Sequence, residues 1–384
     1  MELYPHQKRF LDDNPDKALV CFGAGTGKTL TAIKWLIERK HLKTIVVCPK
    51  TIKARWVEDV KFSANTDVLT KEEFKKIDLN KYQVMVFDEC HAANSPLFTK
   101  QRSQISSKVY EWIKSSNTKH FLGLTATPIS SQPWNIHTLL TFSGKYIDHK
   151  KFRNHFYKLE KRAFMKGRYA WFPKSDWRPM ARQLVEKHCY NATMADVVDH
   201  TPEQHEEIVY LKPTKSEQEM IDFQPENPDH DSDVGVWYAQ HRLEQVKAKI
   251  AKIKELSAGH SKVVIFAKYR EQIEAIEKAL KGDRQVYVMN GSTKDQGAVI
   301  KQAQEDSECF FVVQADISEG YELPDFTCVI YASQSWRKIA DVQSRARVQR
   351  INNLKSNWYY WLLAGDKDKT VFKAIEKGED FLIK

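Results

Sequence analysis

Seven residues near the N-terminus have the composition of a phosphate-binding loop. Segment 23–29 reads Gly-Ala-Gly-Thr-Gly-Lys-Thr, follows an apolar run, and precedes a run with helical spacing. Glycines let the backbone curve round a polyphosphate so that successive N–H groups point at its oxygens, and a helix N-terminus adds positive potential. Lys28 is then predicted to reach the β- and γ-phosphates, and the Thr29 hydroxyl to bind Mg²⁺. The candidate nucleotide ligands in this loop are Gly23, Gly25, Thr26, Gly27, Lys28 and Thr29.

The loop departs from the strict pattern at one position. The spacing G-x-x-x-x-G-K-[ST] requires a glycine at position 22, where this chain has Phe22. Gly23 is adjacent, and strand, loop and helix follow in the order that such a loop needs. We therefore interpret the segment as a nucleotide-binding loop and not as an ordinary glycine-rich turn.

Two neighbouring carboxylates follow a second apolar run. Run 84–88 ends in Asp88, and Glu89, Cys90 and His91 come next. Phosphoryl transfer depends on charge neutralisation and a positioned water more than on covalent chemistry. Asp88 is therefore predicted to hold Mg²⁺, directly or through water, and Glu89 to orient and deprotonate the attacking water. The alternative, a solvated strand end, is disfavoured by the position of the pair after the loop in an alternating pattern.

The elements that must position these residues alternate along the chain. Helical spacing covers 30–40, 105–114 and 242–256, and short apolar, β-branched runs typical of buried parallel strands occupy 18–22, 44–49, 84–88, 121–125, 263–267, 285–289, 310–313, 328–331 and 358–363. This alternation predicts an α/β fold with two doubly wound parallel-sheet lobes. We expect lobes at 1–143 and 205–384, with a basic helical insertion at 144–204. The acidic segment 225–233 is predicted to be an exposed loop or linker.

Composition excludes several classes of protein. Of 384 residues, 42% are hydrophobic and 29% charged, which is neither a disordered nor a membrane composition. The chain has no apolar run of the roughly 20 residues that a membrane-spanning helix needs, and its start lacks the apolar core of a signal peptide. Six cysteines without a CxxC pair indicate buried thiols. We expect an intracellular, cytoplasmic protein without a membrane partner.

Positive charge is concentrated in one segment. Residues 145–182 contain seven lysines, five arginines and three acids, a net charge of +9, whereas the whole chain carries +10. Nine aromatic residues are interleaved with these cations, a composition that can neutralise phosphates and stack on bases. The alternative is that most of these aromatics pack a small helical subdomain. We predict an auxiliary DNA grip that includes Lys150, Lys151 and Arg153.

Several segments of the first lobe resemble motifs of superfamily 2 helicases and translocases. The Asp-Glu-Cys-His run is a DECH box, and Thr-Ala-Thr-Pro at 125–128 resembles motif III. The resemblance implies that His91, Thr125 and Thr127 couple hydrolysis to the nucleic acid. It also implies adenine recognition by Gln7 with Tyr4, and backbone contact by the motif Ia residues Pro49, Lys50 and Thr51.

The second lobe agrees with this resemblance. Segments 262–268, 288–292, 315–324 and 343–351 resemble motif IV, the turn that follows it, and motifs V and VI. The family pattern implies that Gln343, Arg347 and Arg350 contact a nucleotide held between RecA-like lobes, since arginine keeps its charge and can grip phosphate oxygens. The same pattern implies a coupling role for Gly320 and nucleic-acid contacts at Asn290, Gly291, Ser318 and Trp336.

Trp336 favours the Swi/Snf-related branch, because it lies seven residues before Gln343, where that branch has a Trp-Asn-Pro element. Segments 138–148, 151–156 and 206–218 resemble the same branch. The chain looks like a minimal motor core of the sort found in phages. The chain departs from the pattern of this branch at Ala93, at 189–196 and at Asn352-Asn353, so we expect its lobe coupling to differ, and nothing resembles a chromatin-reading module.

The resemblance implies a monomeric, DNA-stimulated ATPase that uses Mg²⁺, translocates on duplex DNA and remodels or anneals branched DNA. A strand-separating DNA or RNA helicase is one alternative. An ATP-gated binding subunit without useful turnover is another, which Lys28, Glu89, Arg347 and Arg350 argue against. DNA is favoured over RNA as the partner.

Overall fold

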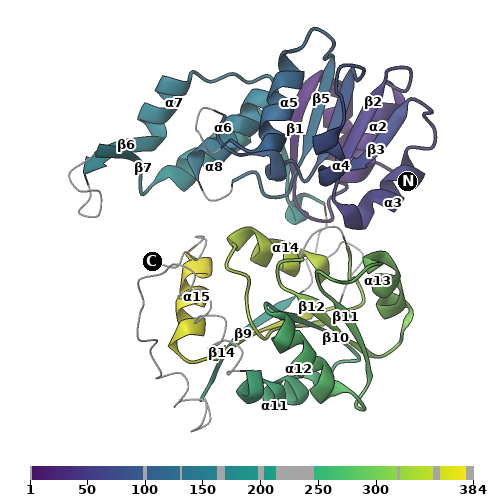
Figure 1. Cartoon of the computed structure of the whole chain (residues 1–384), viewed down its shortest axis with the longest axis vertical. Coiled ribbons are helices and arrows are strands. Elements are labelled where there is room, and N and C mark those ends of the chain that lie inside the picture. The colour runs from purple at the N-terminus through teal and green to yellow at the C-terminus, as the bar shows by residue number, and fades with distance from the viewer. Residues whose placement is uncertain are drawn as a thin grey trace. The chain divides into compact units, whose positions relative to one another are not determined.

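The computed structural model describes residues 2–97, 102–129, 132–161, 169–197, 203–212, 246–317, 321–348 and 355–377. The chain divides into two compact units, Met1–Asp199 (unit 1) and His200–Lys384 (unit 2). Each unit contains a six-stranded sheet in which every strand pair is parallel. The predicted α/β class with two parallel-sheet lobes is therefore confirmed (Figure 1).

The sheet of unit 1 has the strand order β3-β2-β4-β5-β1-β8. Its strands are β1 (Lys17–Phe22), β2 (Thr44–Cys48), β3 (Thr66–Thr70), β4 (Val84–Asp88), β5 (His120–Leu124) and β8 (Tyr190–Ala192). The four strands predicted in this lobe are present. Strands β3 and β8 were missed, because β3 is only half-buried along its length and β8 has three residues, so neither shows a buried apolar run.

Helices cover both faces of this sheet, and apolar residues on each face form a separate core cluster. The helices are α1 (Pro5–Asp13), α2 (Lys28–Ile37), α3 (Lys53–Asp59), α4 (Lys71–Lys76), α5 (Gln104–Lys114), α6 (Pro133–Phe142), α7 (His149–Phe156) and α8 (Trp177–His188). Helix α2 begins two residues before the predicted 30–40 and ends at Ile37. Because all strands are parallel, the loops after their carboxyl ends meet at one edge of the sheet.

The basic segment belongs to unit 1 and is only partly helical. Between α7 and α8 the chain forms an antiparallel hairpin of β6 (Tyr157–Lys161) and β7 (Tyr169–Pro173). The prediction of a helical insertion at 144–204 therefore left out the strands β6, β7 and β8. In Figure 1, the hairpin and α7 extend beyond α6 and α8, away from the parallel sheet.

The sheet of unit 2 has the order β11-β12-β10-β13-β14-β9. Its elements are β9 (Gln204–Leu211), α11 (Val246–Ser257), β10 (Lys262–Ala267), α12 (Arg270–Leu280), β11 (Gln285–Met289), α13 (Gln296–Glu305), β12 (Cys309–Gln314), β13 (Cys328–Tyr331), α14 (Lys338–Val348), β14 (Asn357–Ala364) and α15 (Asp366–Glu376). The five predicted strands are present. The acidic segment 225–233 and the start of the predicted helix 242–256 lie outside the described residues.

The six cysteines are free thiols, and five of them are buried, as the sequence predicts. None of the helices in the described part of the chain has the length and apolar character that crossing a bilayer requires.

Candidate functional site

The glycine-rich loop connects β1 to α2, and the Lys28 side chain hydrogen-bonds back to the start of the loop. Gly25 and Gly27 have φ angles of +78° and +89°, in the left-handed region that favours glycine. The Lys28 ammonium donates to the carbonyl oxygens of Phe22 at 3.0 Å and of Gly23 at 3.1 Å. Thr29 lies half-buried in the first turn of α2. An anion in the loop would compete with the two carbonyls for the ammonium, so the lysine is near the position that phosphate binding requires.

Helix α1 is fixed to the loop by side chains. Gln7 is 1% exposed, and its Nε2 donates to the Gly27 carbonyl at 3.1 Å while its Oε1 accepts from the Tyr4 backbone N–H at 2.9 Å. His6 Nε2 lies 2.9 Å from the Thr26 carbonyl, and the His6 ring stacks on Tyr4. Gln7, predicted with Tyr4 to recognise adenine, therefore lies against the loop, and Tyr4 contacts Gln7 and His6.

Phe22, the departure from the strict loop pattern, has a packing role. Its side chain is fully buried, and its ring packs edge-to-face with the His6 ring at a centroid distance of 4.6 Å. A glycine at position 22 would have no side chain to make this contact. The side chain that breaks the pattern thus helps to attach α1 to the loop.

The carboxylate of Asp88 is buried at the end of β4. The Trp56 indole Nε1 donates to its Oδ2 at 2.9 Å, and the Glu89 backbone N–H donates to its Oδ1 at 3.0 Å. Burial and the negative charge of Glu89 raise the pKa of Asp88 to about 6, against the hydrogen bond from Trp56 and the positive charge of Lys28. The charges of Glu89 and Lys28 therefore both act on the Asp88 carboxylate at this edge of the sheet.

Glu89 begins a short polar network that reaches β5. Its φ angle of +51° is unusual for a residue with a side chain. Glu89 Oε2 and Thr125 Oγ1 each lie 3.3 Å from His91 Nδ1, and the Thr127 N–H donates to Thr125 Oγ1 at 3.0 Å. The structure thus brings together the carboxylate and the three residues predicted to couple hydrolysis to nucleic acid.

The motif Ia residues follow β2 at the same edge. Pro49 precedes a short 3₁₀ turn, Lys50–Ile52, in which Lys50 is exposed and Thr51 half-buried. Their contact with nucleic acid stays a prediction. Of the basic trio, Lys150 and Lys151 are exposed in the first turns of α7, and the Arg153 guanidinium lies 4.3 Å from the centre of the Trp171 ring.

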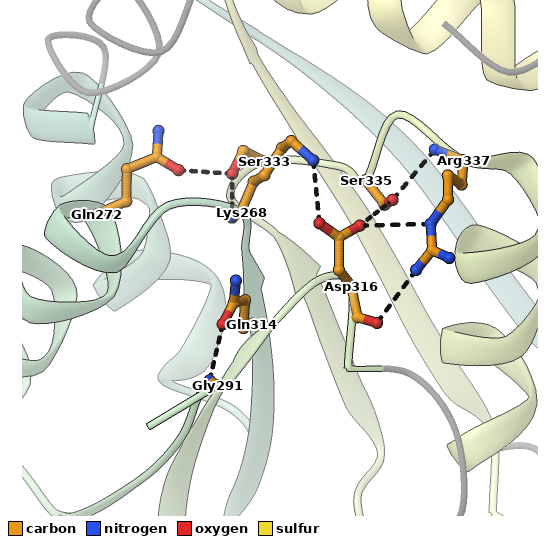
Figure 2. Close-up of polar contacts among 8 residues, drawn as sticks. All are labelled: Lys268, Gln272, Gly291, Gln314, Asp316, Ser333, Ser335 and Arg337. Atoms are coloured by element: carbon orange, nitrogen blue, oxygen red, sulfur yellow. Dashed lines mark hydrogen bonds and ion pairs between the residues drawn. The ribbon is translucent and has the colours of Figure 1, made fainter. Parts of the chain in front are cut away.

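The carboxyl edge of the second sheet carries a network centred on Asp316, which Figure 2 shows. The Asp316 carboxylate accepts from Lys268 Nζ at 3.1 Å and from Ser335 Oγ at 2.5 Å, with Arg337 Nε 3.9 Å away. Lys268 also lies 4.9 Å from the centre of the Trp336 ring. The network joins the ends of β10, β12 and β13. Of these residues around Asp316, only Trp336 was predicted from the sequence to have a role.

The other predicted site residues of unit 2 are not part of the Asp316 network. The Gly291 N–H donates to Gln314 Oε1 at 2.9 Å, next to Asn290 at the end of β11 (Figure 2). Gln343 is buried, and Arg347, 7% exposed, donates from Nε to the Gln343 carbonyl and from Nη1 to the Tyr321 carbonyl. Arg347 therefore donates to carbonyl groups of its own unit. The predicted residues Ser318, Gly320 and Arg350 lie outside the described residues.

Known proteins resemble the chain in both units. Residues 248–352 match the helicase conserved C-terminal domain, and residues 57–130 match the type III restriction enzyme res subunit. The SWI/SNF-related matrix-associated actin-dependent regulator of chromatin subfamily A-like protein 1 homolog of Caenorhabditis elegans is 23% identical over 265 residues, which cover 60% of this chain and 36% of that protein. The chain thus resembles superfamily 2 helicases of the Swi/Snf-related type. It spans only about a third of this curated relative.

Two solved structures align with the chain over nearly its whole length. The Pyrococcus furiosus Hef helicase domain has a TM-score of 0.53 at 14% identity, with 98% of each chain covered, and it supports the fold. The Sulfolobus solfataricus SWI2/SNF2 ATPase core in complex with dsDNA has a TM-score of 0.42 at 15% identity, covering 99% of this chain and 94% of that one. The two family matches place one matched segment in each unit of the chain.

Two side chains that contact the loop or the carboxylates, Trp56 and His6, were not predicted from the sequence. Trp56 lies 32 positions from Asp88, and a tryptophan in an amphipathic helix gives no sign that its N–H meets a carboxylate. His6 was passed over beside Gln7, although a polar ring next to the predicted adenine-recognising residue was a usable signal.

Replacing Gly27 by alanine should destabilise unit 1 by about 1–3 kcal/mol, from left-handed backbone strain and a steric clash. A Cβ there would lie 2.3 Å from Gln7 Nε2 and displace the amide from its carbonyl partner. Gly282→Ala is a matched control, because Gly282 also has a positive φ, +97°, but no atom near its Cβ position. Denaturant unfolding measures the loss of unfolding free energy in each variant. An equal loss in both would show that the clash with Gln7 is not a cause.

Replacing Asp316 by asparagine should destabilise unit 2 by about 1–2 kcal/mol at neutral pH. Burial acts to raise the pKa of Asp316, but hydrogen bonds from Ser335 and Lys268 and the charges of Lys268 and Arg337 hold it below its ordinary value. The stabilisation is complete above about pH 5 and is lost as the pH falls through the lowered pKa.

Urea unfolding of Asp316→Asn and of the parent between pH 7 and pH 3 measures this effect. The two proteins should converge in acid, whereas Asp325→Asn, at an exposed position, should match the parent throughout. A difference that is independent of pH would contradict a role for the ionised carboxylate.

Proposed function

We propose that the protein hydrolyses ATP at the carboxyl edge of the unit 1 sheet and uses the energy to translocate on duplex DNA. We also propose that it remodels or anneals branched DNA. The observation that carries the ATPase site is the buried Asp88 carboxylate at the end of β4, with the negative charge of Glu89 and the positive charge of Lys28 both close enough to shift its pKa. Three groups that phosphoryl transfer needs, a cation, a metal-binding carboxylate and a candidate base, thus come from two strand ends.

The residues of this edge fit ATP and Mg²⁺. Gly25 and Gly27 have no Cβ atom at the two loop positions with left-handed φ angles, and Lys28 donates to carbonyl oxygens that phosphate oxygens can replace. The raised pKa of Asp88 reflects a buried pair of carboxylates with too little positive charge around it, which a divalent cation would correct. Asp88 and the Thr29 hydroxyl would hold Mg²⁺, which neutralises phosphate charge when bound.

Within this proposal, the chain's own groups have distinct tasks. Lys28 binds and orients the β- and γ-phosphates, and Gln7 with Tyr4 orients the base. Glu89 accepts the proton of the attacking water at a carboxylate oxygen. His91 lies between Glu89 and Thr125, so a shift of β5 in response to nucleic acid would reach the base through two contacts. The phosphate contacts of Arg347 and Arg350 remain predictions.

The DNA assignment has two supports. The segment 145–182 carries a net charge of +9, and its exposed cations Lys150 and Lys151 lie on α7. A strongly positive face raises the local concentration of a polyanion. The sequence resemblance to the Swi/Snf-related branch favours duplex DNA over RNA.

An ATPase assay with duplex DNA, single-stranded DNA, forked DNA and RNA at fixed salt tests the proposal. Duplex or forked DNA should stimulate hydrolysis most, and triplex displacement without duplex unwinding should mark translocation. Stronger stimulation by RNA would reject DNA as the partner. Unwinding of a forked duplex would favour the alternative of a strand-separating helicase.

A further inference from the structure

The β6–β7 hairpin presents an exposed aromatic face. In its register, Leu159 lies opposite Trp171 and Lys161 opposite Tyr169. Residues directly opposite in an antiparallel pair, and alternate residues along a strand, share a face. Leu159, Trp171 and Tyr169 therefore lie on one face, with exposures of 51%, 39% and 65%.

The core of this region does not use these three side chains. At the base of the hairpin, Tyr157 is buried and stacks on Trp134, which also contacts Phe152, and Phe152 stacks on Phe156. The aromatics of the basic segment thus divide into a packed set and an exposed set. Several large apolar side chains exposed together on one small element mark an interaction surface.

The surroundings of the exposed face are cationic. The Arg153 guanidinium stacks over the Trp171 ring at 4.3 Å, and its Nε has no hydrogen-bond acceptor among the described residues. Lys161 shares the face, whereas Glu160, the acid of the hairpin, is on the opposite face and pairs with Lys158 at 2.6 Å. Aromatic rings beside arginine and lysine suit a ligand that combines π-faces with negative charge, as nucleotides do.

We propose that this face, defined by Leu159, Tyr169, Trp171 and Arg153, binds unpaired bases at the junction of branched DNA. An intact duplex offers phosphates but keeps its base faces stacked, so only unpaired nucleotides present both partners of this surface. The inference rests on the proposed DNA-dependent function and adds that the hairpin recognises the junction of its branched substrate.

Binding of forked DNA with 2-aminopurine in the first unpaired position tests the proposal. Trp171→Ala and Tyr169→Ala should each weaken fork and single-strand binding at least about fivefold, because base stacking on an aromatic is worth that much. They should abolish the quenching of 2-aminopurine and leave blunt-duplex affinity unchanged. Trp171→Phe should recover most of the binding.

Matched controls are available elsewhere in the chain. Phe62 is as exposed as Trp171, at 39%, and Tyr210, at 64%, matches Tyr169. Phe62→Ala and Tyr210→Ala should bind every DNA like the parent. Thermal unfolding of each variant shows whether the hairpin substitutions damage the fold, and a variant that melts like the parent gives a valid binding result.

Several results would overturn the inference. Equal losses for duplex and fork would make the hairpin a general phosphate contact, and unchanged fork binding would remove it from the DNA surface. Self-association of the parent that Trp171→Ala abolishes would assign the face to a second copy of the chain. If duplex DNA stimulates the parent ATPase but the hairpin variants keep normal fork affinity, the inference fails and the proposed function stands. If no DNA stimulates hydrolysis, the proposed function fails.

Discussion

Replacing Glu89 by glutamine should lower the DNA-stimulated ATPase rate by about 10²- to 10⁴-fold, the usual contribution of a general base. ATP binding should stay within a few-fold of the parent, because Lys28 and the loop are unchanged. The negative charge of Glu89 helps to raise the pKa of Asp88, so the substitution also lowers that pKa and leaves Asp88 more fully ionised. A loss of rate therefore cannot come from protonation of Asp88.

Steady-state hydrolysis and equilibrium ATP binding together measure this effect. Glu111→Gln, at an exposed carboxylate of the same unit that pairs with Arg102, should hydrolyse ATP like the parent. A Glu89→Gln variant with the parent rate would reject Glu89 as the base. It would also restore the alternative of an ATP-gated binding subunit.

Replacing Lys28 by alanine should lower the hydrolysis rate and also weaken ATP binding, each by about 10²-fold or more, as for loss of a single charged transition-state donor. The ammonium that bonds the carbonyls of Phe22 and Gly23 is the cation of this loop. Its charge also lowers the pKa of Asp88, so its removal pushes that pKa further above its ordinary range. Loss of phosphate binding and weaker ionisation of Asp88, the proposed metal ligand, should then both lower the hydrolysis rate.

The two substitutions differ in their ATP affinity. Glu89→Gln should bind ATP and fail to hydrolyse it, whereas Lys28→Ala should fail in both. Lys34→Ala is the matched control for the second, since Lys34 is exposed on the same helix, and it should behave like the parent. Normal ATP affinity in Lys28→Ala would mean that the loop does not bind phosphate through this lysine.

The architecture was predictable because its signals are local. Buried parallel strands such as β4 and β10 are continuous apolar runs, and the polar residues that follow them mark the carboxyl edge of the sheet. The loop at 23–29 and the Asp88–Glu89 pair were found in this way. The hairpin escaped prediction because its two five-residue strands are almost entirely unburied, so they lack the signal of a buried strand, and they lie in a segment dominated by charge.

What the sequence determined by itself was the set of chemical groups and the strand ends that carry them. Lys28, Asp88, Glu89 and His91 follow strands whose apolar pattern fixes their edge of the sheet. Only the tertiary structure decided the partners, because packing brings distant segments together. It gave Asp88 the indole of Trp56, attached the loop to His6, turned Arg347 toward Tyr321, and left Trp171 exposed beneath Arg153. Side-chain partners of this kind depend on how elements pack in three dimensions, and no local pattern of residue types encodes them.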